Sequence, residues 1–262
     1  MNNIIKRVQE INEYQDMIKG LVRRELRGKY KASLLGFLWN FINPLISIVV
    51  YIIVFSWVYQ SGIEQYPIYL IVGMMPWNFF SSSIGGGAGA IVHQADMTKK
   101  IFFPREVLVI STVTANFINL LITYIIVLAI VFTWRPIERP IILFYLVIAF
   151  LTEYMFSLGI ALLLAAIDVY FRDVEYMTGV ILMAWVWMTP VMYAINGVPQ
   201  ILQNVLKFNP MTWYIKLYQN TLYYNIQSSG ELVLTCLITG IIALLIGEIV
   251  FMHLEGDFAE EL

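Results

Sequence analysis

Long blocks of apolar residues alternate with short polar stretches along almost the whole chain. A helix rises about 1.5 Å per residue, so about 20 apolar residues cross the roughly 30 Å hydrocarbon core of a bilayer. The blocks of this length are Leu34–Tyr59, Tyr66–Val92, Val107–Thr133, Ile141–Ile167, Tyr176–Ile195 and Glu231–His253. The pattern therefore predicts an all-α membrane protein with six transmembrane helices.

Prolines fall inside three of the predicted spans, at Pro44, Pro76 and Pro190. A proline inside a helix removes one backbone hydrogen bond and its ring clashes with the preceding turn. We therefore expect each of these three helices to be kinked or interrupted at its proline.

The N-terminal segment, residues 1–33, has the pattern of an amphipathic helix. Its apolar residues recur at spacings of three and four, at Ile11, Tyr14, Ile18, Leu21, Val22 and Leu26. A basic amphipathic helix beside a membrane lies at the level of the lipid headgroups, so we expect an interfacial helix here. A solvated cluster of charges that only fixes the orientation is the alternative. Residues 34–262 are expected to form one six-helix domain.

The stretch between the fifth and sixth spans has a different pattern. Residues 196–230 contain Pro199 and Pro210 and yet remain apolar and aromatic. This is too apolar for a solvated loop and too broken for a straight span. Irregular backbone at membrane depth is tolerated only where it packs on protein or lines a cavity. We expect short re-entrant helices here, either as the outer gate of a pore or as a lid over the bundle.

The composition agrees with a membrane protein. Of the 262 residues, 60% are hydrophobic and 13% are charged, whereas soluble domains have about 45–50% apolar and about 25% charged residues. The single cysteine, Cys236, excludes a disulfide framework, and the net charge of −2 argues against a nucleic-acid partner. The N-terminal segment lacks the apolar core of a cleavable signal peptide, so the first span is expected to act as the insertion signal.

The distribution of lysine and arginine predicts the orientation in the membrane. Twelve of the sixteen basic residues fall in the N-terminal segment and in the loops after the second and fourth spans, and four fall on the other side. Loops rich in lysine and arginine resist translocation. We therefore expect a multi-pass protein with both termini in the cytoplasm.

Two short loops on the predicted cytoplasmic side combine aromatic and charged residues. Residues 94–106 read QADMTKKIFFPRE, and residues 168–175 read DVYFRDVE. Aromatic side chains exposed at a membrane surface either dip into the lipid or fill the groove of a partner protein. The residues alone leave docking and headgroup anchoring equally open.

Candidate catalytic chemistry is sparse. The glycine-rich run at 85–89 lacks the lysine and the hydroxyl residue of a phosphate-binding loop. We expect it to serve helix packing instead, through Ser81, Gly85 and Gly89. Glu153 and Glu248 stand among few ionisable residues inside the spans, and an ion-coupled carrier would need more. We expect this chain to have no catalytic residue, to bind no metal and to hold no cofactor.

Three stretches together resemble one family, the six-helix permease subunits of polysaccharide ABC exporters. They are LVRRELRGKYKASLLGFLWNFINPL at 21–45, KKIFFPRE at 99–106 and YFRDVEYM at 170–177. Their order and spacing, with an aromatic segment before the last span, extend the resemblance over nearly the whole chain.

The resemblance implies the channel-forming, non-catalytic subunit of an ATP-driven exporter in the bacterial inner membrane. Such an exporter moves a lipid-linked polysaccharide outward, for example O-antigen of lipopolysaccharide or teichoic acid. The resemblance implies a homodimer that binds two cytoplasmic ATPase subunits, and these hold the ATP and Mg²⁺. An ion-coupled secondary transporter and a membrane-bound transferase of lipid-linked sugars are the alternatives.

The resemblance also implies roles for individual residues. Those that would couple to the ATPase are Asp96, Lys99, Lys100, Ile101, Phe102, Phe103 and Arg105 of the first loop, and Tyr170, Arg172 and Asp173 of the second. The basic residues that would shelter the entering lipid headgroup are Arg23, Arg24 and Arg27. The outer gate helices would lie at about 198–224.

Aromatic residues are the candidates for a channel surface, because sugars stack on aromatic faces. The candidates are Trp39, Trp77, Phe79, Phe80, Trp185 and Trp187. Tryptophan and tyrosine are also enriched at both membrane interfaces, so an interfacial belt is the alternative interpretation of these side chains.

Overall fold

The computed structural model describes residues 2–28, 63–134 and 142–262, together with residues 38–39, 42, 45–46, 49–50 and 53–54. The predicted first span, Leu34–Tyr59, lies almost entirely outside the described residues. The main helices are α1 (Asn2–Glu13), α2 (Gln15–Gly28), α4 (Tyr66–Ala88), α5 (Ala95–Lys100), α6 (Glu106–Trp134), α7 (Leu143–Tyr170), α8 (Asp173–Trp185), α9 (Gln200–Leu206), α10 (Pro210–Tyr218), α11 (Gly230–Leu254) and α12 (Phe258–Glu261). Regular structure in the described part is helical throughout, without a strand, which confirms the all-α class.

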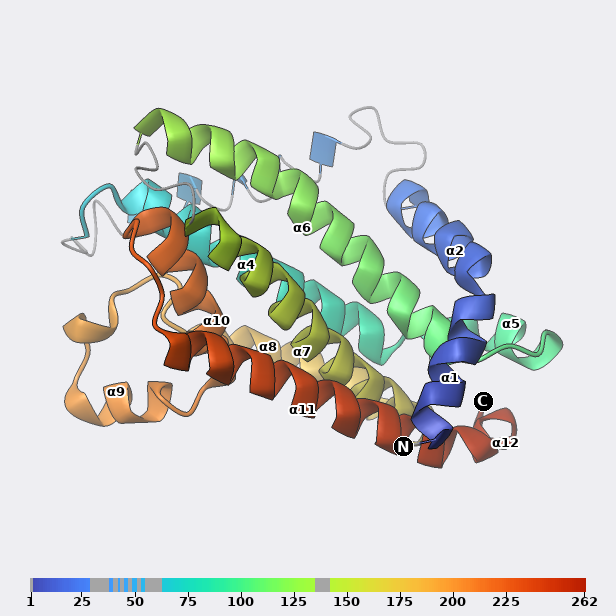
Figure 1. Cartoon of the computed structure of the whole chain (residues 1–262). Helices are drawn as coiled ribbons and strands as arrows, with labels where there is room; N and C mark the ends of the chain where they lie inside the picture. The colour runs from blue at the N-terminus through green and yellow to red at the C-terminus, as the bar shows by residue number, and fades with distance from the viewer. Residues whose placement is uncertain are drawn as a thin grey trace.

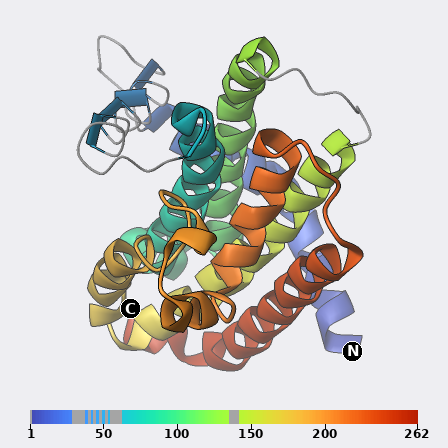
Figure 2. The ribbon, with the colours of Figure 1, turned by 90° about the vertical axis from the view of Figure 1, so that its left-hand side faces the viewer.

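The long helices form an elongated bundle with two distinct ends. Both chain termini lie at one end, near α1, α5 and α12, and we call this the terminal end (Figure 1). Helices α9 and α10 lie at the opposite end, which we call the α10 end (Figure 1). Seen from the α10 end, α10 runs among the long helices (Figure 2), and it packs against α4, α7 and α11.

Three helical stretches of the described part are long and apolar enough to cross a membrane. They are Glu106–Trp134, Leu143–Tyr170 and Gly230–Asp257. Each begins within two residues of the start of a predicted span. Helix α4 has 23 residues and begins at Tyr66, as predicted, while α8 has only 13. The chain therefore has the apolar helices of an integral membrane protein, and the count of six spans stays a prediction.

Helix α4 lies at the centre of the core and continues through Pro76 without interruption. From Tyr66 to Phe80 all but two of its residues are buried, since α6, α7 and α8 pack around it. Of the kink or interruption expected at Pro76, the interruption is absent. Neighbouring helices that cover a helix on all sides help it to tolerate the hydrogen bond that proline removes.

Helix α8 ends at Trp185, inside the predicted span Tyr176–Ile195, for which we expect a kink or an interruption at Pro190. The N–H groups of Trp187, Met188 and Thr189 bond to carbonyls three residues back instead of four, at 3.1–3.2 Å. Pro190 follows at once and has no N–H group with which to continue the helix. The interruption expected in this span is therefore confirmed, and the helix ends before Pro190 is reached.

Glycines set the close contact between α7 and α11, the helix pair with the most extensive packing. A Cβ atom added at Gly247 would lie 2.1 Å from the carbonyl oxygen of Gly159. In the glycine run at 85–89, an added Cβ would lie 2.7 Å from Ala161 of α7 at Gly87 and 2.7 Å from Glu175 of α8 at Gly89. Small residues at these points let the helix backbones approach closely.

Candidate functional site

The first predicted coupling loop folds as a short helix followed by an extended residue. Asp96 lies in the first turn of α5, and Lys99 and Lys100 lie in the last turn. This charge order complements the helix dipole. Ile101 then leaves the helix with extended backbone angles. The three charged side chains are exposed, so they remain available to a partner.

The two phenylalanines that follow this helix point in different directions. Phe102 is 95% exposed, and Ile101 beside it is also exposed. Phe103 is buried in a cluster with Leu21, Val107 and Leu108. The resemblance implies a docking role for both phenylalanines, whereas the structure presents Phe102 outward and buries Phe103 between the loop, α2 and α6.

The second predicted loop lies beside the first at the terminal end. Phe171 is 67% exposed, and Arg172 and Asp173 are exposed next to it. The His93 Nε2 and Glu175 Oε2 atoms lie 3.0 Å apart, which joins the segment before α5 to the first turn of α8. The structure thus brings the two loops together, as their shared predicted function requires.

Arg105 and Tyr170 turn inward, toward the C-terminal residues. Arg105 Nη1 donates to the carbonyl oxygen of Glu255 at 2.7 Å, and the Tyr170 hydroxyl donates to the carbonyl oxygen of Leu254 at 2.9 Å. The guanidinium of Arg105 also lies 5.7 Å from the ring centre of Phe258. These two predicted coupling residues therefore contact their own chain.

An ionic network that the sequence analysis missed fixes α1 to the bundle. Arg7 donates to both carboxylate oxygens of Glu106, at 2.6 and 2.7 Å, and also to the carboxylate of Glu255. Burial alone would lower the pKa of Arg7, but these hydrogen bonds raise it above its ordinary value, so the side chain stays charged. Sequence separations of 99 and 248 residues left no local signal for this network.

A cavity of ≈350 Å³ lies between α1 and the first loop. Its lining residues are Arg7, Glu10, Glu13, Tyr14, Phe102, Phe103, Pro104 and Glu255. The cavity thus combines carboxylates with the exposed ring of Phe102, a combination that suits a cationic side chain.

The basic residues expected to meet a lipid headgroup lie along α2. Arg23, Arg24 and Arg27 are all exposed, while Leu21 and Val22 bury the opposite face. Arg24 donates to the side-chain oxygen of Gln94. Helix α2 packs along α6 through its buried face, so its basic face points outward.

The six candidate channel aromatics have different surroundings. Trp77, Phe79 and Phe80 are buried within the protomer. Trp185 is half-buried, and its ring centre lies 5.3 Å from that of Phe80 in an edge-to-face contact. Trp187 is 56% exposed, and Trp39 is half-buried.

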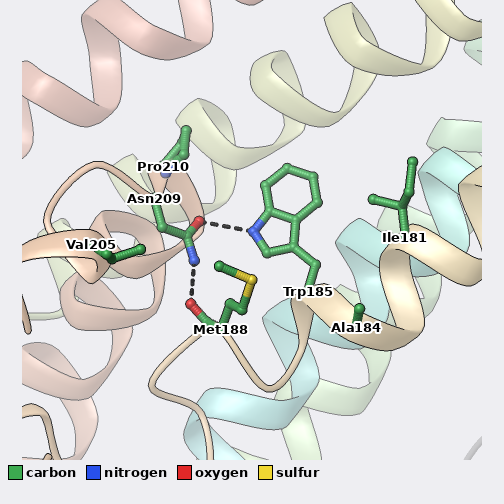
Figure 3. Close-up of a pocket in the computed structure, with 7 residues that line it drawn as sticks. All are labelled: Ile181, Ala184, Trp185, Met188, Val205, Asn209 and Pro210. Atoms are coloured by element: carbon green, nitrogen blue, oxygen red, sulfur yellow. Dashed lines mark hydrogen bonds between the residues drawn. The ribbon is translucent and has the colours of Figure 1, made fainter. Parts of the chain in front are cut away.

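Trp185 also borders an apolar cavity of ≈350 Å³ between α8 and the segment before α10. Figure 3 shows its lining residues, which are Ile181, Ala184, Trp185, Met188, Val205, Asn209 and Pro210. Asn209 accepts from the indole N–H of Trp185 at 3.0 Å and donates to the carbonyl oxygen of Met188 at 2.7 Å (Figure 3). The same side chain caps α10 by accepting from Met211 N at 3.0 Å.

The broken chain after α8 leaves carbonyl groups without helical partners, and side chains bond to them. Tyr66 donates to the Met192 carbonyl at 3.0 Å, and Tyr69 donates to the Tyr193 carbonyl at 2.8 Å. Gln219 donates to the Pro190 carbonyl at 3.1 Å. Buried carbonyls without such donors are costly, so these side chains stabilise an irregular segment inside the protein.

Glu153 lies at the junction of α7 and α10. Its side chain is fully buried, and it accepts a hydrogen bond from the Tyr218 hydroxyl at 2.6 Å. Residues Gln219–Tyr223, directly after α10, form a π-helix, a form that often marks functional sites. Glu153 is one of the few ionisable residues in the predicted spans, but no sequence signal pairs it with Tyr218, 65 residues away.

Comparison with known proteins adds family information to this geometry. The family model for ABC-2 type transporters matches residues 17–223. The O-antigen export system permease protein RfbA of Myxococcus xanthus is 32% identical over 99% of this chain and 100% of its own length.

More distant relatives are similar over most of their length. A protein named O-antigen export system permease protein RfbA from Klebsiella pneumoniae is 28% identical over 94% of both chains. The polysialic acid transport protein KpsM of Escherichia coli is 22% identical over 81% of this chain and 83% of its own. The family match includes both loops of the terminal end and α10.

Proposed function

Since this chain belongs to the ABC-2 type transporter family, we propose that it is the channel-forming subunit of an ATP-driven exporter. Its cargo is a lipid-linked polysaccharide, and its location is the bacterial inner membrane. The names of the relatives, which export O-antigen or transport polysialic acid, support this class of cargo. They favour the exporter over an ion-coupled carrier or a transferase.

One observation carries the proposal: both loops present apolar aromatic residues at the same end of the bundle. Ile101, Phe102 and Phe171 are exposed there, with the charges of Lys99, Lys100, Arg172 and Asp173 around them. Exposed aromatic side chains ringed by charges are typical of protein interfaces. Two ATPase subunits, which bind ATP and Mg²⁺, would dock here on a homodimer of this chain.

The cavity between α1 and the first loop adds a second contact to this surface. A basic side chain of the ATPase could enter it, near Glu10, Glu13 and the ring of Phe102. Arg7 and Glu255 are already bonded to each other at its wall. The docking surface we propose therefore extends from α5 to α1.

Substrate contacts would involve other parts of the molecule. The exposed basic residues of α2, Arg23 and Arg27 above all, would bind an anionic lipid headgroup. Trp187 and Trp185 are the candidates for a sugar-contacting surface, since Trp77, Phe79 and Phe80 are buried within the protomer. Residues 196–230 would form the outer gate.

The membrane topology that goes with this function has six spans and both termini in the cytoplasm. The basic residues at the terminal end support this orientation. Helices α1 and α2, in place of one continuous helix, would lie along the cytoplasmic surface, and the six-helix domain would follow from residue 34.

The direct test is ATP-dependent transport by the chain together with its ATPase into inverted membrane vesicles, whose outer, cytoplasmic leaflet carries the lipid-linked polysaccharide. Phe102→Ala should reduce both ATPase co-purification and export, without lowering the melting temperature. Phe103→Ala is the matched variant, because it should lower the melting temperature through a core cavity that costs about 3–5 kcal/mol. Export without nucleotide, or full ATPase binding by Phe102→Ala, would contradict the proposal.

A further inference from the structure

We propose that the C-terminal turn, residues 254–258, is a positioning element that holds the two coupling loops in a fixed relation. Two consecutive carbonyl groups of this turn each accept a hydrogen bond from a different loop. The Leu254 carbonyl accepts from Tyr170 of the second loop, at 2.9 Å. The Glu255 carbonyl accepts from Arg105 of the first loop, at 2.7 Å.

A buried aromatic residue completes this contact. Phe258 is fully buried, and its ring centre lies 6.1 Å from that of Tyr170 and 5.5 Å from that of Phe251. Arg105 lies 5.7 Å from the same ring centre. Arg105 and Tyr170 thus each touch the turn twice, once at a carbonyl and once at the ring of Phe258.

The two residues that bond to the turn lie at the ends of long helices. Arg105 directly precedes α6, and Tyr170 is the last residue of α7. The backbone at Glu255 is helical, with φ −58° and ψ −28°, and Glu255–Asp257 continue α11 as a 3-10 turn, so this backbone conformation sets the spacing of the two adjacent carbonyls. Two loops bonded to adjacent peptide units therefore move together, and a displacement of one is transmitted to the other and to α11.

The carboxylate of Glu255 extends the same link to the N-terminal helix, since Arg7 of α1 donates to it. The carboxylate of Glu255 therefore bonds to α1, and its main-chain carbonyl bonds to the first loop. This turn is the place where α1, both loops and α11 meet.

This inference rests on the proposed function, because it assigns a role in coupling to ATP hydrolysis. In that role the turn keeps the two loops matched to one ATPase surface, so that a movement of the ATPase drives α6 and α7 together. A turn that only adds stability would leave the geometry of the loops unchanged when its hydrogen bonds are removed.

The test uses two single substitutions with matched controls. Tyr170→Phe removes one hydrogen bond and keeps the ring, and Tyr176→Phe makes the same change at an exposed tyrosine. Arg105→Met removes the donors and keeps the aliphatic stem, and Arg105→Lys restores a donor. Spin labels at Phe102→Cys and Phe171→Cys, with Cys236→Ala, report the distance between the loops, and export per ATP is measured in separate chains that keep Phe102 and Phe171.

We expect a narrow distance distribution in the otherwise unchanged chain and a broad one in Tyr170→Phe and Arg105→Met. Export per ATP hydrolysed should fall about tenfold in Arg105→Met, the factor that corresponds to one charge-assisted hydrogen bond. Tyr176→Phe should change neither quantity, and Arg105→Lys should recover part of the coupling.

Unchanged distances with a lower melting temperature would overturn the inference, because the turn would then be purely stabilising. Unchanged export per ATP in Tyr170→Phe and Arg105→Met would overturn it as well. Failure of the proposed function would look different: the chain without these substitutions would neither bind an ATPase nor export polymer, whatever the loop distances.

Discussion

The two ends of the bundle hold their irregular segments by different kinds of contact. At the terminal end, Arg7 donates to the carboxylates of Glu106 and Glu255, and Arg105 donates to the main-chain carbonyl of Glu255. At the α10 end, neutral donors such as Tyr66, Tyr69 and Asn209 bond to the carbonyls of the broken chain after α8. Glu153 is paired there with a tyrosine instead of a cation.

This difference follows from the environment expected at each end. Charged pairs are tolerated near water and can be exchanged for contacts with a charged partner. A charged group within the bilayer is costly, so neutral donors suit the segment that the membrane would surround. In the proposed function the charged contacts of the terminal end suit a surface that receives a partner, whereas the neutral donors of the α10 end suit an irregular chain inside apolar surroundings.

The largest expected effect is at the terminal end, in Glu106→Ala. Glu106 is fully buried and holds the guanidinium of Arg7 with both oxygens, so its loss leaves a partly buried cation without its main partner. We expect a loss of about 3 kcal/mol of stability, measured by thermal unfolding in nanodiscs. Glu10→Ala removes the more exposed partner of Arg7 and should cost less than about 1 kcal/mol. Equal effects of the two variants would contradict the network.

The next effect is at the α10 end, in Asn209→Ala. This change removes the cap of α10 and the hydrogen bonds to Trp185 and Met188, which together are worth about 2 kcal/mol. Limited proteolysis should cut residues 196–230 faster in the variant. Asn204→Ala, on the exposed side of α9, is the control and should leave the cleavage rate unchanged. Equal cleavage of both variants would show that Asn209 does not hold this segment.

A smaller effect is expected from Tyr218→Phe, which removes the hydrogen bond to Glu153. Such a bond between membrane helices is worth about 0.6–1.7 kcal/mol, and the resulting drop in melting temperature should be the same at low and high salt. Tyr224→Phe changes a more exposed ring and should have no effect. A loss that disappears at high salt would mean that the pair is exposed to solvent.

The smallest effect is expected from Arg24→Met. Arg24 bonds to Gln94 from an exposed position on α2, and contacts of this kind contribute less than about 0.5 kcal/mol. Arg23→Met is the matched variant on the same helix. Both should melt like the unchanged chain, and a large drop for Arg24→Met would assign the arginine a structural role instead of one at the lipid headgroup.

The sequence predicts the long helices well, because a run of apolar residues with helical length has few alternatives. Helices α6, α7 and α11 begin close to the predicted positions. The meeting of the two loops at one end also agrees with the even number of crossings between them. The position of a proline alone does not predict where a helix ends, since Pro76 lies within a continuous helix while Pro190 follows the end of one.

Individual contacts could not be predicted, because they depend on which side chains meet in three dimensions. Phe102 and Phe103 are adjacent and chemically identical, yet one is exposed and the other buried. The sequence predicts close helix packing at the glycine run 85–89, but Gly159 and Gly247 make a closer helix contact. The pairing of Arg7 with Glu106 and Glu255 likewise has no local pattern.

Site-specific photo-crosslinking tests most directly whether the terminal end receives an ATPase. A crosslinking residue at Phe102, at the terminal end, is compared with one at Phe208, which is also exposed but lies between α9 and α10. We expect the residue at 102 to form an adduct with the nucleotide-binding subunit in intact cells, and the residue at 208 to form none. An ATPase adduct at 208 but not at 102 would contradict this account of the molecule.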